Sequence, residues 1–140
     1  MPTDPPRDNE GKIVPHNHPE ILDEHFVIRH TDPHDLCPDG SGGKRISSGA
    51  YTESSDSGMS VDIEDWTVAA GLAPLHYITD PSQGAVRLQV GELRKLGLLV
   101  GWDPDGGHPH HASVWNLGGP KQRKRVARLA VTLRRCEGET

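Results

Sequence analysis

Short stretches of this chain alternate apolar and polar residues, a pattern typical of β-strands with one buried face. In residues 21–30, Phe26 and Ile28 alternate with neighbours such as Arg29, which predicts a first strand. The same reasoning predicts further strands at residues 45–52, 59–63, 75–78, 98–102 and 111–117.

Other segments carry apolar residues at helical spacing. Val86, Val90 and Leu93 stand four and then three residues apart, which predicts a helix over residues 83–96 that ends before Gly97. Helices are also predicted over residues 65–72 and 120–135.

Proline and glycine mark the remaining segments. Residues 31–44 contain both, which predicts a loop that ends in a hairpin turn. Residues 1–20 hold five prolines and several acids, which indicates a flexible arm. The order of elements favours an α+β fold: a small mixed or antiparallel sheet with two to three helices and a disordered N-terminal arm. We expect a single domain over residues 21–136.

Composition excludes several classes of protein. The net charge is -5, which excludes a uniformly basic nucleic-acid-binding surface, although residues 101–140 are basic overall. Cys37 and Cys136 lack the spacing of a zinc site or a disulfide framework, so we expect free thiols. No apolar run reaches the roughly 18 residues of a membrane span, and no secretory leader follows Met1. We therefore expect a soluble, cytoplasmic protein with no membrane partner.

Histidine is abundant, with nine residues, and imidazole is both a common metal ligand and a natural base near neutral pH. The clusters at residues 16–18 and 108–111 lack the HExxH spacing, so we predict no metal site. His111 differs from the other histidines because it begins a predicted strand, which would fix the direction of its side chain. It is a candidate general base, or alternatively a histidine that caps the strand.

Two adjacent serines raise the possibility of a serine nucleophile. Ser48, His111 and Asp62 supply the three residue types of a nucleophile, a base and an orienting acid. However, the chain has no GxSxG motif to expose the hydroxyl, and hydroxyl residues in strands also pair across a sheet. Both roles stay open.

The same region could hold an anion without a nucleophile. Arginine presents a planar fork to phosphate or carboxylate, and serine hydroxyls add donors. The candidate ligand-binding residues are Arg29, His30, Arg45, Ser47 and Tyr51. Together they predict a pocket for an anionic or nucleotide ligand, and the sequence indicates no particular cofactor.

Basic residues with no intervening acid fill the predicted C-terminal helix. The candidate contact residues are Lys121, Arg123, Lys124, Arg125 and Arg128. Such a helix could bind phosphate backbones with an affinity that falls steeply with salt. It could equally dock on an acidic protein surface or form the solvated face of an amphipathic helix.

Several short motifs occur together along the chain. They are RxSSxA at residues 45–50, SVD at 60–62, DP at 103–104, PxHAxV at 109–114 and ARLA at 127–130. With these motifs the chain resembles a group of small bacterial proteins that share the pattern RxSSxAF…SVD…DP…PxHAxV…KxxxARxLA. Tyr51 departs from the Phe of that pattern, and Met59 departs from the Leu that precedes SVD in the group. The resemblance covers about residues 25–131 and implies which positions matter, but no reaction.

These features leave three functional hypotheses. The first is a small ligand- or partner-binding module with an anion-suited pocket, accessory to a bacterial conflict or defence operon. Its partner would be an anionic small molecule or a protein encoded nearby. The second is an enzyme that acts on a nucleotide or phosphoester, with His111 as general base. The third is nucleic-acid binding through the basic helix at residues 121–135.

Overall fold

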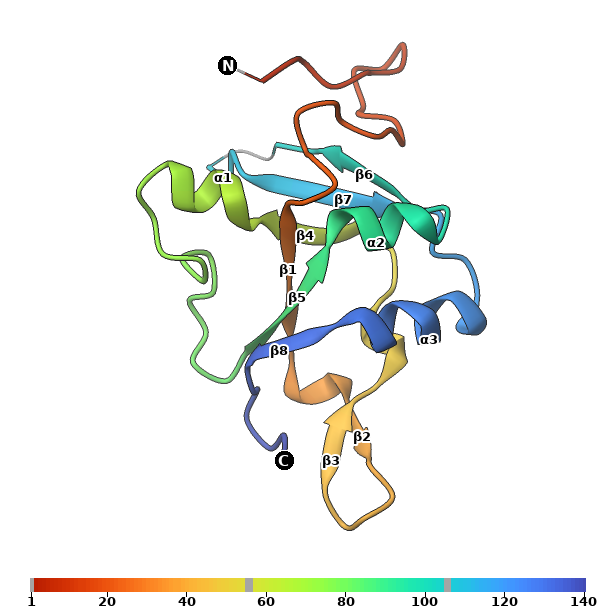
Figure 1. The fold of residues 1–140 in the computed structure, drawn as a ribbon, viewed down its shortest axis with the longest axis vertical. Coiled ribbons are helices and arrows are strands. Elements are labelled where there is room, and N and C mark those ends of the chain that lie inside the picture. Colours follow the sequence, from red (N-terminus) through yellow and green to blue (C-terminus); the bar gives the residue numbers. More distant parts are fainter. Residues whose placement is uncertain (1, 55–56, 105–106) are drawn as a thin grey trace.

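Antiparallel pairing builds one six-stranded sheet in the computed structural model, which describes residues 2–54, 57–104 and 107–140 (Figure 1). The strand order is β6-β7-β4-β1-β5-β8, and β2 and β3 form a separate hairpin. The strands are β1 (Phe26–Thr31), β2 (Leu36–Pro38), β3 (Lys44–Ile46), β4 (Met59–Ile63), β5 (Gly84–Gln89), β6 (Leu99–Trp102), β7 (His111–Trp115) and β8 (Val131–Arg134). The helices are α1 (Glu64–Ala69), α2 (Val90–Lys95) and α3 (Pro120–Leu129). The predicted α+β fold is therefore confirmed.

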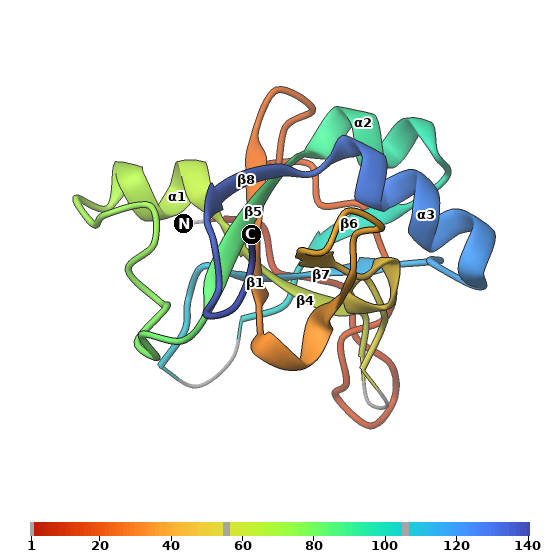
Figure 2. The ribbon, with the colours of Figure 1, turned by 90° about the horizontal axis from the view of Figure 1, so that it is seen from below.

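The two faces of the sheet have different surroundings. Val27, Val61 and Leu88 lie on one face, where they pack with buried residues of α2 and α3 in the main hydrophobic core. Figure 2 shows α2 and α3 on the same side of the sheet. Alternate residues of a strand point to opposite faces of the sheet. Asp62 follows Val61 in β4 and therefore lies on the opposite face, directly across from His111 in the neighbouring strand.

The connection from α1 to β5 covers part of this second face. Residues 74–77 form a turn there and Ile78 follows it, so the strand predicted over residues 75–78 is wrong. Ile78 packs with Ile28 and Ala85 in a second, smaller core, and this packing holds the connection against the sheet. Tyr77, the residue before Ile78, is thereby brought to the polar face.

The helix predicted over residues 83–96 is wrong in its first half, where β5 stands before the short helix α2. β5 pairs with β1 along six residue pairs. It is buried on both faces, with Val86 in the main core and Ala85 in the second core. A strand covered on both faces does not show clean alternation, so its apolar residues also fit a helical spacing. Gly97, at φ +86°, follows α2 as predicted.

The helix predicted over residues 120–135 is too long. α3 ends at Leu129, and the chain continues as β8, which pairs with β5 at the edge of the sheet. Val126 packs in the main core, whereas Leu133 packs against the second core. The apolar stripe that predicts one helix therefore belongs to two elements.

The strand predicted over residues 45–52 is also shorter than expected. β3 ends at Ile46, and Ser48–Ala50 form a 3-10 turn that packs against α3. The hairpin turn predicted at the end of residues 31–44 is confirmed, since β2 and β3 pair across it and two of its glycines adopt positive φ.

Residues 2–20 form no helix or named strand, and residues 16–18 of this N-terminal segment lie along the free edge of β6. The His18 N–H donates to the Val100 carbonyl at 3.0 Å, and the Val100 N–H donates to Asn17 Oδ1 at 2.9 Å. These bonds satisfy part of an otherwise open strand edge. The flexibility expected of the arm stays a prediction. Within the described ranges, no helix is long and apolar enough to cross a membrane.

Candidate functional site

The candidate site is centred on Asp62, a carboxylate on the polar face of β4. Its neighbours Val61 and Ile63 belong to the main core, so strand geometry directs the Asp62 side chain to the opposite face. That side chain is only 3% exposed. A carboxylate removed from water is costly unless it is paired, so its partners decide what it can do.

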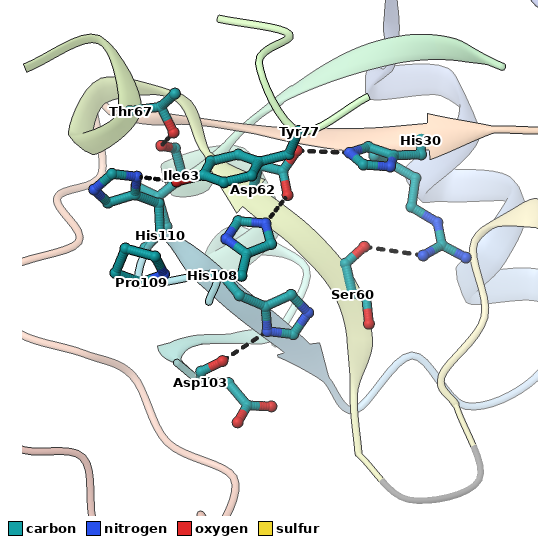
Figure 3. A network of polar contacts seen from close by, with 12 residues as sticks. His30, Ser60, Asp62, Ile63, Thr67, Tyr77, Asp103, His108, Pro109 and His110 are labelled. Atoms are coloured by element: carbon teal, nitrogen blue, oxygen red, sulfur yellow. Dashed lines mark hydrogen bonds and ion pairs between the residues drawn. The ribbon is translucent and has the colours of Figure 1, made fainter. Parts of the chain in front are cut away.

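Two histidines from distant parts of the chain bind Asp62 (Figure 3). His30 Nε2 lies 2.6 Å from Oδ2, and His108 Nε2 lies 2.7 Å from Oδ1. A carboxylate only accepts hydrogen bonds, so each Nε2 must carry a hydrogen. In their neutral forms both rings therefore present Nδ1 as an acceptor.

These bonds also set the ionisation of Asp62. Burial raises the pKa of its carboxyl, but hydrogen bonds and attraction from His30 and then His108 outweigh burial, so the pKa lies below its ordinary value. Asp62 is thus a carboxylate at neutral pH, and it fixes the orientation of both imidazoles.

Tyr77 covers the imidazole of His108. The two rings are stacked with centroids 3.7 Å apart and an interplanar angle of 20°. The Tyr77 hydroxyl shares a hydrogen bond of 2.7 Å with His110 Nδ1. Partial burial and the nearby charge of Asp62 raise the pKa of Tyr77, so its hydroxyl stays protonated. His108 is therefore held both in its plane and at one ring nitrogen.

His111 has the opposite tautomer. Its Nδ1 lies 2.7 Å from the Asp103 carbonyl, which can only accept, so Nδ1 carries the hydrogen. A neutral His111 keeps its lone pair on Nε2. The Asp103 carboxylate in turn accepts from Ser113 at 2.7 Å and Ser57 at 2.9 Å, which fixes the loop that holds His111.

Arg29 joins the site where β1 stops pairing with β4. Its Nη1 donates to the Ser60 carbonyl at 2.9 Å, and its Nε and Nη2 donate to the Ala50 carbonyl at 3.2 and 2.9 Å. Burial lowers the pKa of Arg29, although a guanidinium stays charged in proteins. Two of its five N–H groups are not used by these bonds and could reach a ligand.

These side chains surround one small pocket. Its volume is about 130 Å³. The lining residues are Arg29, His30, Ser60, Val61, Asp62, His108 and His111. Since one water occupies about 30 Å³ of liquid, the pocket has room for one small group such as a phosphate or a carboxylate. A larger ligand would extend beyond it.

The structure does not bring the predicted serine to this pocket. Ser48 lies in the 3-10 turn against α3, on the main-core side of the sheet, whereas His111 lies on the other face. Arg45 and Ser48 line a separate pocket of about 350 Å³ with residues of α3. The predicted triad of Ser48, His111 and Asp62 is therefore not assembled, although His111 and Asp62 are neighbours.

Two other predicted ligand-binding residues have structural roles. Ser47 Oγ accepts the Gly49 N–H at 3.1 Å and caps the 3-10 turn. Tyr51 is 2% exposed in the main core, and burial raises its pKa to about 12. Of the predicted anion-binding set, the structure places Arg29 and His30 at the pocket and leaves the others elsewhere.

The predicted basic residues of α3 form a surface cluster. Lys121, Lys124, Arg125 and Arg128 line a pocket of about 330 Å³. Arg123 does not line this pocket, and its Nη1 donates to the Gly118 carbonyl at 3.4 Å. Within residues 2–54, 57–104 and 107–140, no group of three or more His, Cys, Asp or Glu side chains could hold a metal ion.

His108 and Tyr77 are site residues that the sequence did not reveal. Both lie in irregular segments, so no periodicity fixes their direction. His108 is three residues before His111 in a histidine-rich run, so residue type alone pointed to it as a candidate. No feature of the sequence pointed to Tyr77.

Comparison of the chain with protein families, with curated proteins and with solved structures finds no match. The resemblance to the bacterial group therefore gains no support, and the site is interpreted from its own geometry.

Proposed function

We propose that the protein is an enzyme that binds a phosphoester group in the Asp62 pocket and cleaves it by acid–base catalysis. The observation that carries this proposal is that three imidazoles and one buried carboxylate line the same pocket. Asp62 orients His30 and His108 through Nε2, while His111 is held through Nδ1. Titratable groups with contrasting environments in one pocket are typical of active sites.

His111 and His30 have roles that follow from their free nitrogens, whereas His108 stays bound to Asp62. His111 Nε2 takes a proton from an attacking water as a new P–O bond forms. The P–O bond to the leaving group breaks, and the leaving oxygen takes a proton from Nδ1 of a protonated His30. Exchange with solvent then returns His111 to its neutral form and His30 to its protonated form.

Arg29 and Asp62 determine how the pocket receives an anion. Their charges offset one another, so the pocket attracts an anion most strongly when one imidazole is protonated. The reaction needs a neutral His111 and a protonated His30 at the same time.

The test uses p-nitrophenyl phosphate and bis(p-nitrophenyl) phosphate as substrates and inorganic phosphate as a binding probe. In the His111→Asn variant, the amide can keep the hydrogen bond to the Asp103 carbonyl but lacks the base at Nε2. We expect at least a hundredfold loss of kcat with little change in phosphate affinity. His34→Asn is the matched control, because His34 is exposed and outside the pocket.

Two outcomes would contradict the proposal. Turnover of neither ester by the wild-type protein, with phosphate bound at the pocket, would support the ligand-binding module instead. Equal turnover by the wild-type protein and the His111→Asn variant would show that His111 is not the base.

Nucleic-acid binding is a second candidate, and a separate observation favours it. Arg45 lies beside Lys124 and Arg128, so β3 extends the basic cluster of α3 into a groove. Phosphate backbones are bound by such clustered cations. This candidate function is tested by measuring how salt affects the binding of a nucleic-acid duplex to the wild-type protein and to a variant of this groove.

A further inference from the structure

A second pocket is lined mainly by aromatic and small apolar side chains, unlike the polar Asp62 pocket. Its volume is about 570 Å³, which is within the range of small-molecule sites. Two of the three tryptophans of the chain are half-buried in the wall of this tryptophan pocket. The lining residues are Pro2, Glu20, Trp66, Ala69, Ala70, Trp102, Pro109 and His110.

The tryptophan pocket is separate from the candidate active site. Trp66 and Trp102 pack against the main hydrophobic core, whereas Asp62 and His111 lie on the opposite face of the sheet. The described linings of the two pockets have no residue in common. A ligand of the tryptophan pocket is therefore a second ligand, and its binding does not depend on the proposed catalysis.

The two indoles are held rigidly and meet at an angle. Their ring centroids are 5.7 Å apart with an interplanar angle of 68°. The buried ring of His18 lies edge to face on Trp66 and on Trp102, with centroids 5.8 Å away in both cases. His18 Nε2 shares a 2.7 Å bond with the Thr3 carbonyl, and Trp102 Nε1 donates to the Pro109 carbonyl at 2.8 Å. These contacts preform an aromatic corner, so a ligand would not have to order it.

An aromatic corner of this kind suits a rounded cation. The face of an indole ring is the negative part of its quadrupole, and it attracts a cation that lies within about 6 Å of the ring centroid. A flat ligand can stack on only one of two rings that meet at an angle. A trimethylammonium group is nearly spherical and can contact both rings at once. The geometry therefore favours an alkylated ammonium group over a planar ligand.

The charges of the pocket agree with a cationic occupant. Among the described residues of the lining there is no lysine or arginine, and Glu20 supplies a negative charge. Hydrogen bonds from the Thr3 hydroxyl and N–H lower the pKa of Glu20, so it is a carboxylate at neutral pH. Both of these bonds go to Oε1, at 2.6 and 2.7 Å. Burial and the neighbouring His108 lower the pKa of His110, so its imidazole is neutral and does not repel a cation.

We propose that the tryptophan pocket binds a small organic cation with a trimethylammonium group, held against Trp66 and Trp102 beside the Glu20 carboxylate. Glu20 is exposed, so its charge lies at the rim of the pocket and the indoles form the apolar wall. The pocket also has room for a short tail on the cation. Choline, with its hydroxyethyl tail, is therefore a suitable probe.

The experiment compares choline with 3,3-dimethyl-1-butanol, which has the same shape but no charge, by isothermal titration. Cation–π attraction predicts that choline binds roughly tenfold more tightly. A pocket that selects only for apolar surface would show the opposite order, because the alcohol is the less polar compound. The affinity for choline should also fall as salt is added.

Two variants test the groups that recognise the charge. Glu20→Gln keeps an oxygen that can accept both Thr3 bonds but removes the charge, so it should lower choline affinity roughly twofold to fivefold at low salt. Its affinity for the alcohol should not change. Glu24→Gln is the matched control, because Glu24 is exposed and outside the pocket. Trp66→Leu keeps the wall apolar but removes one π-face, so choline should lose most of its advantage over the alcohol.

A third variant tests whether both compounds bind in this pocket. Ala69→Phe narrows the pocket from an exposed helix position and should weaken the binding of both. Val68→Phe is the matched control, since Val68 is exposed and outside the pocket, and it should weaken neither.

Three outcomes would overturn the inference. They are no measurable binding of choline to the wild-type protein, choline binding no tighter than the alcohol, and a choline advantage that survives both Glu20→Gln and Trp66→Leu. Circular dichroism checks that Trp66→Leu is folded. If it is not, Glu20→Gln and its control decide the result, because both change exposed side chains.

Discussion

Replacement of Asp62 by Asn tests the centre of the site, because the amide has the same shape but only one oxygen. Asn can accept one Nε2–H, while its NH2 group faces the second imidazole donor. The variant therefore removes the charge from both hydrogen bonds, and the second imidazole can bond the amide only by moving its own hydrogen to Nδ1. A hydrogen bond to a charged group contributes about 1.5–3 kcal/mol. Since His30 and His108 are 30% and 22% exposed, solvent offsets part of the loss. We expect the free energy of unfolding to fall by about 2 kcal/mol.

Thermal and urea denaturation followed by circular dichroism measure this loss, which corresponds to roughly 5–10 °C in Tm for a chain of this size. The pKa of Asp62 is lowered in the folded protein, so its contribution is present above its unfolded value, 3.8, and is lost as pH falls through the folded value. The difference between wild type and variant should be undiminished at pH 5 and should shrink below pH 3.8.

Asp4→Asn is the control, because it removes the same charge from an exposed position and should change stability by less than about 0.5 kcal/mol. An Asp62→Asn variant as stable as this control at pH 7 would refute the view that the carboxylate holds both imidazoles. A difference that persisted unchanged well below the folded pKa would refute its electrostatic origin.

Three further predictions concern other parts of the protein. Tyr77→Leu removes the ring stack on His108 and should lower the free energy of unfolding, measured by urea denaturation, by about 1 kcal/mol. Tyr77→Phe keeps the ring and should lower it by less than half as much. Equal losses in the two variants would mean that the hydroxyl matters more than the ring. Gly101→Ala places a Cβ 2.6 Å from the His16 ring and should displace the N-terminal segment from β6. Amide hydrogen exchange at the β6 edge should therefore accelerate. Unchanged protection would mean that the segment does not pack against β6. Lys124→Glu combined with Arg128→Glu should lower duplex affinity by more than tenfold at low salt and flatten its salt dependence; an unaltered salt slope would exclude this groove as a nucleic-acid interface.

The fold class follows from the sequence because alternation and turn residues are local signals. Strands β4 and β7 carry clear alternation, and their bounds are close to those expected. β5 does not, because the connection over residues 72–83 covers the face that a half-buried strand would expose. No local pattern could reveal that cover, and the apolar residues of β5 fitted a helix equally well.

The same limit explains which site residues could be predicted. Asp62 and His111 were identifiable because each occupies a strand position whose side chain points to the face opposite that of the core residues in the same strand. Arg45 and Ser48 were grouped with them because of their residue types. The 3-10 turn between β3 and β4 carries Ser48 to the other side of the sheet, and a turn of this kind has no periodicity from which its packing could be inferred.

The histidine run at residues 108–111 shows why residue type alone was a weak guide. β7 begins at His111, so alternation governs that residue but not the three before it. Tertiary contacts place the others: Asp62 and Tyr77 hold His108, and Trp102 holds the Pro109 carbonyl. The run therefore divides its side chains between two pockets, and its chemistry depends on groups from β4, β6 and the α1–β5 connection. A substitution at Trp102 should consequently disturb both pockets, whereas Ala69→Phe, which lies on α1, should disturb only the pocket lined by Trp66, Trp102, Pro109 and His110.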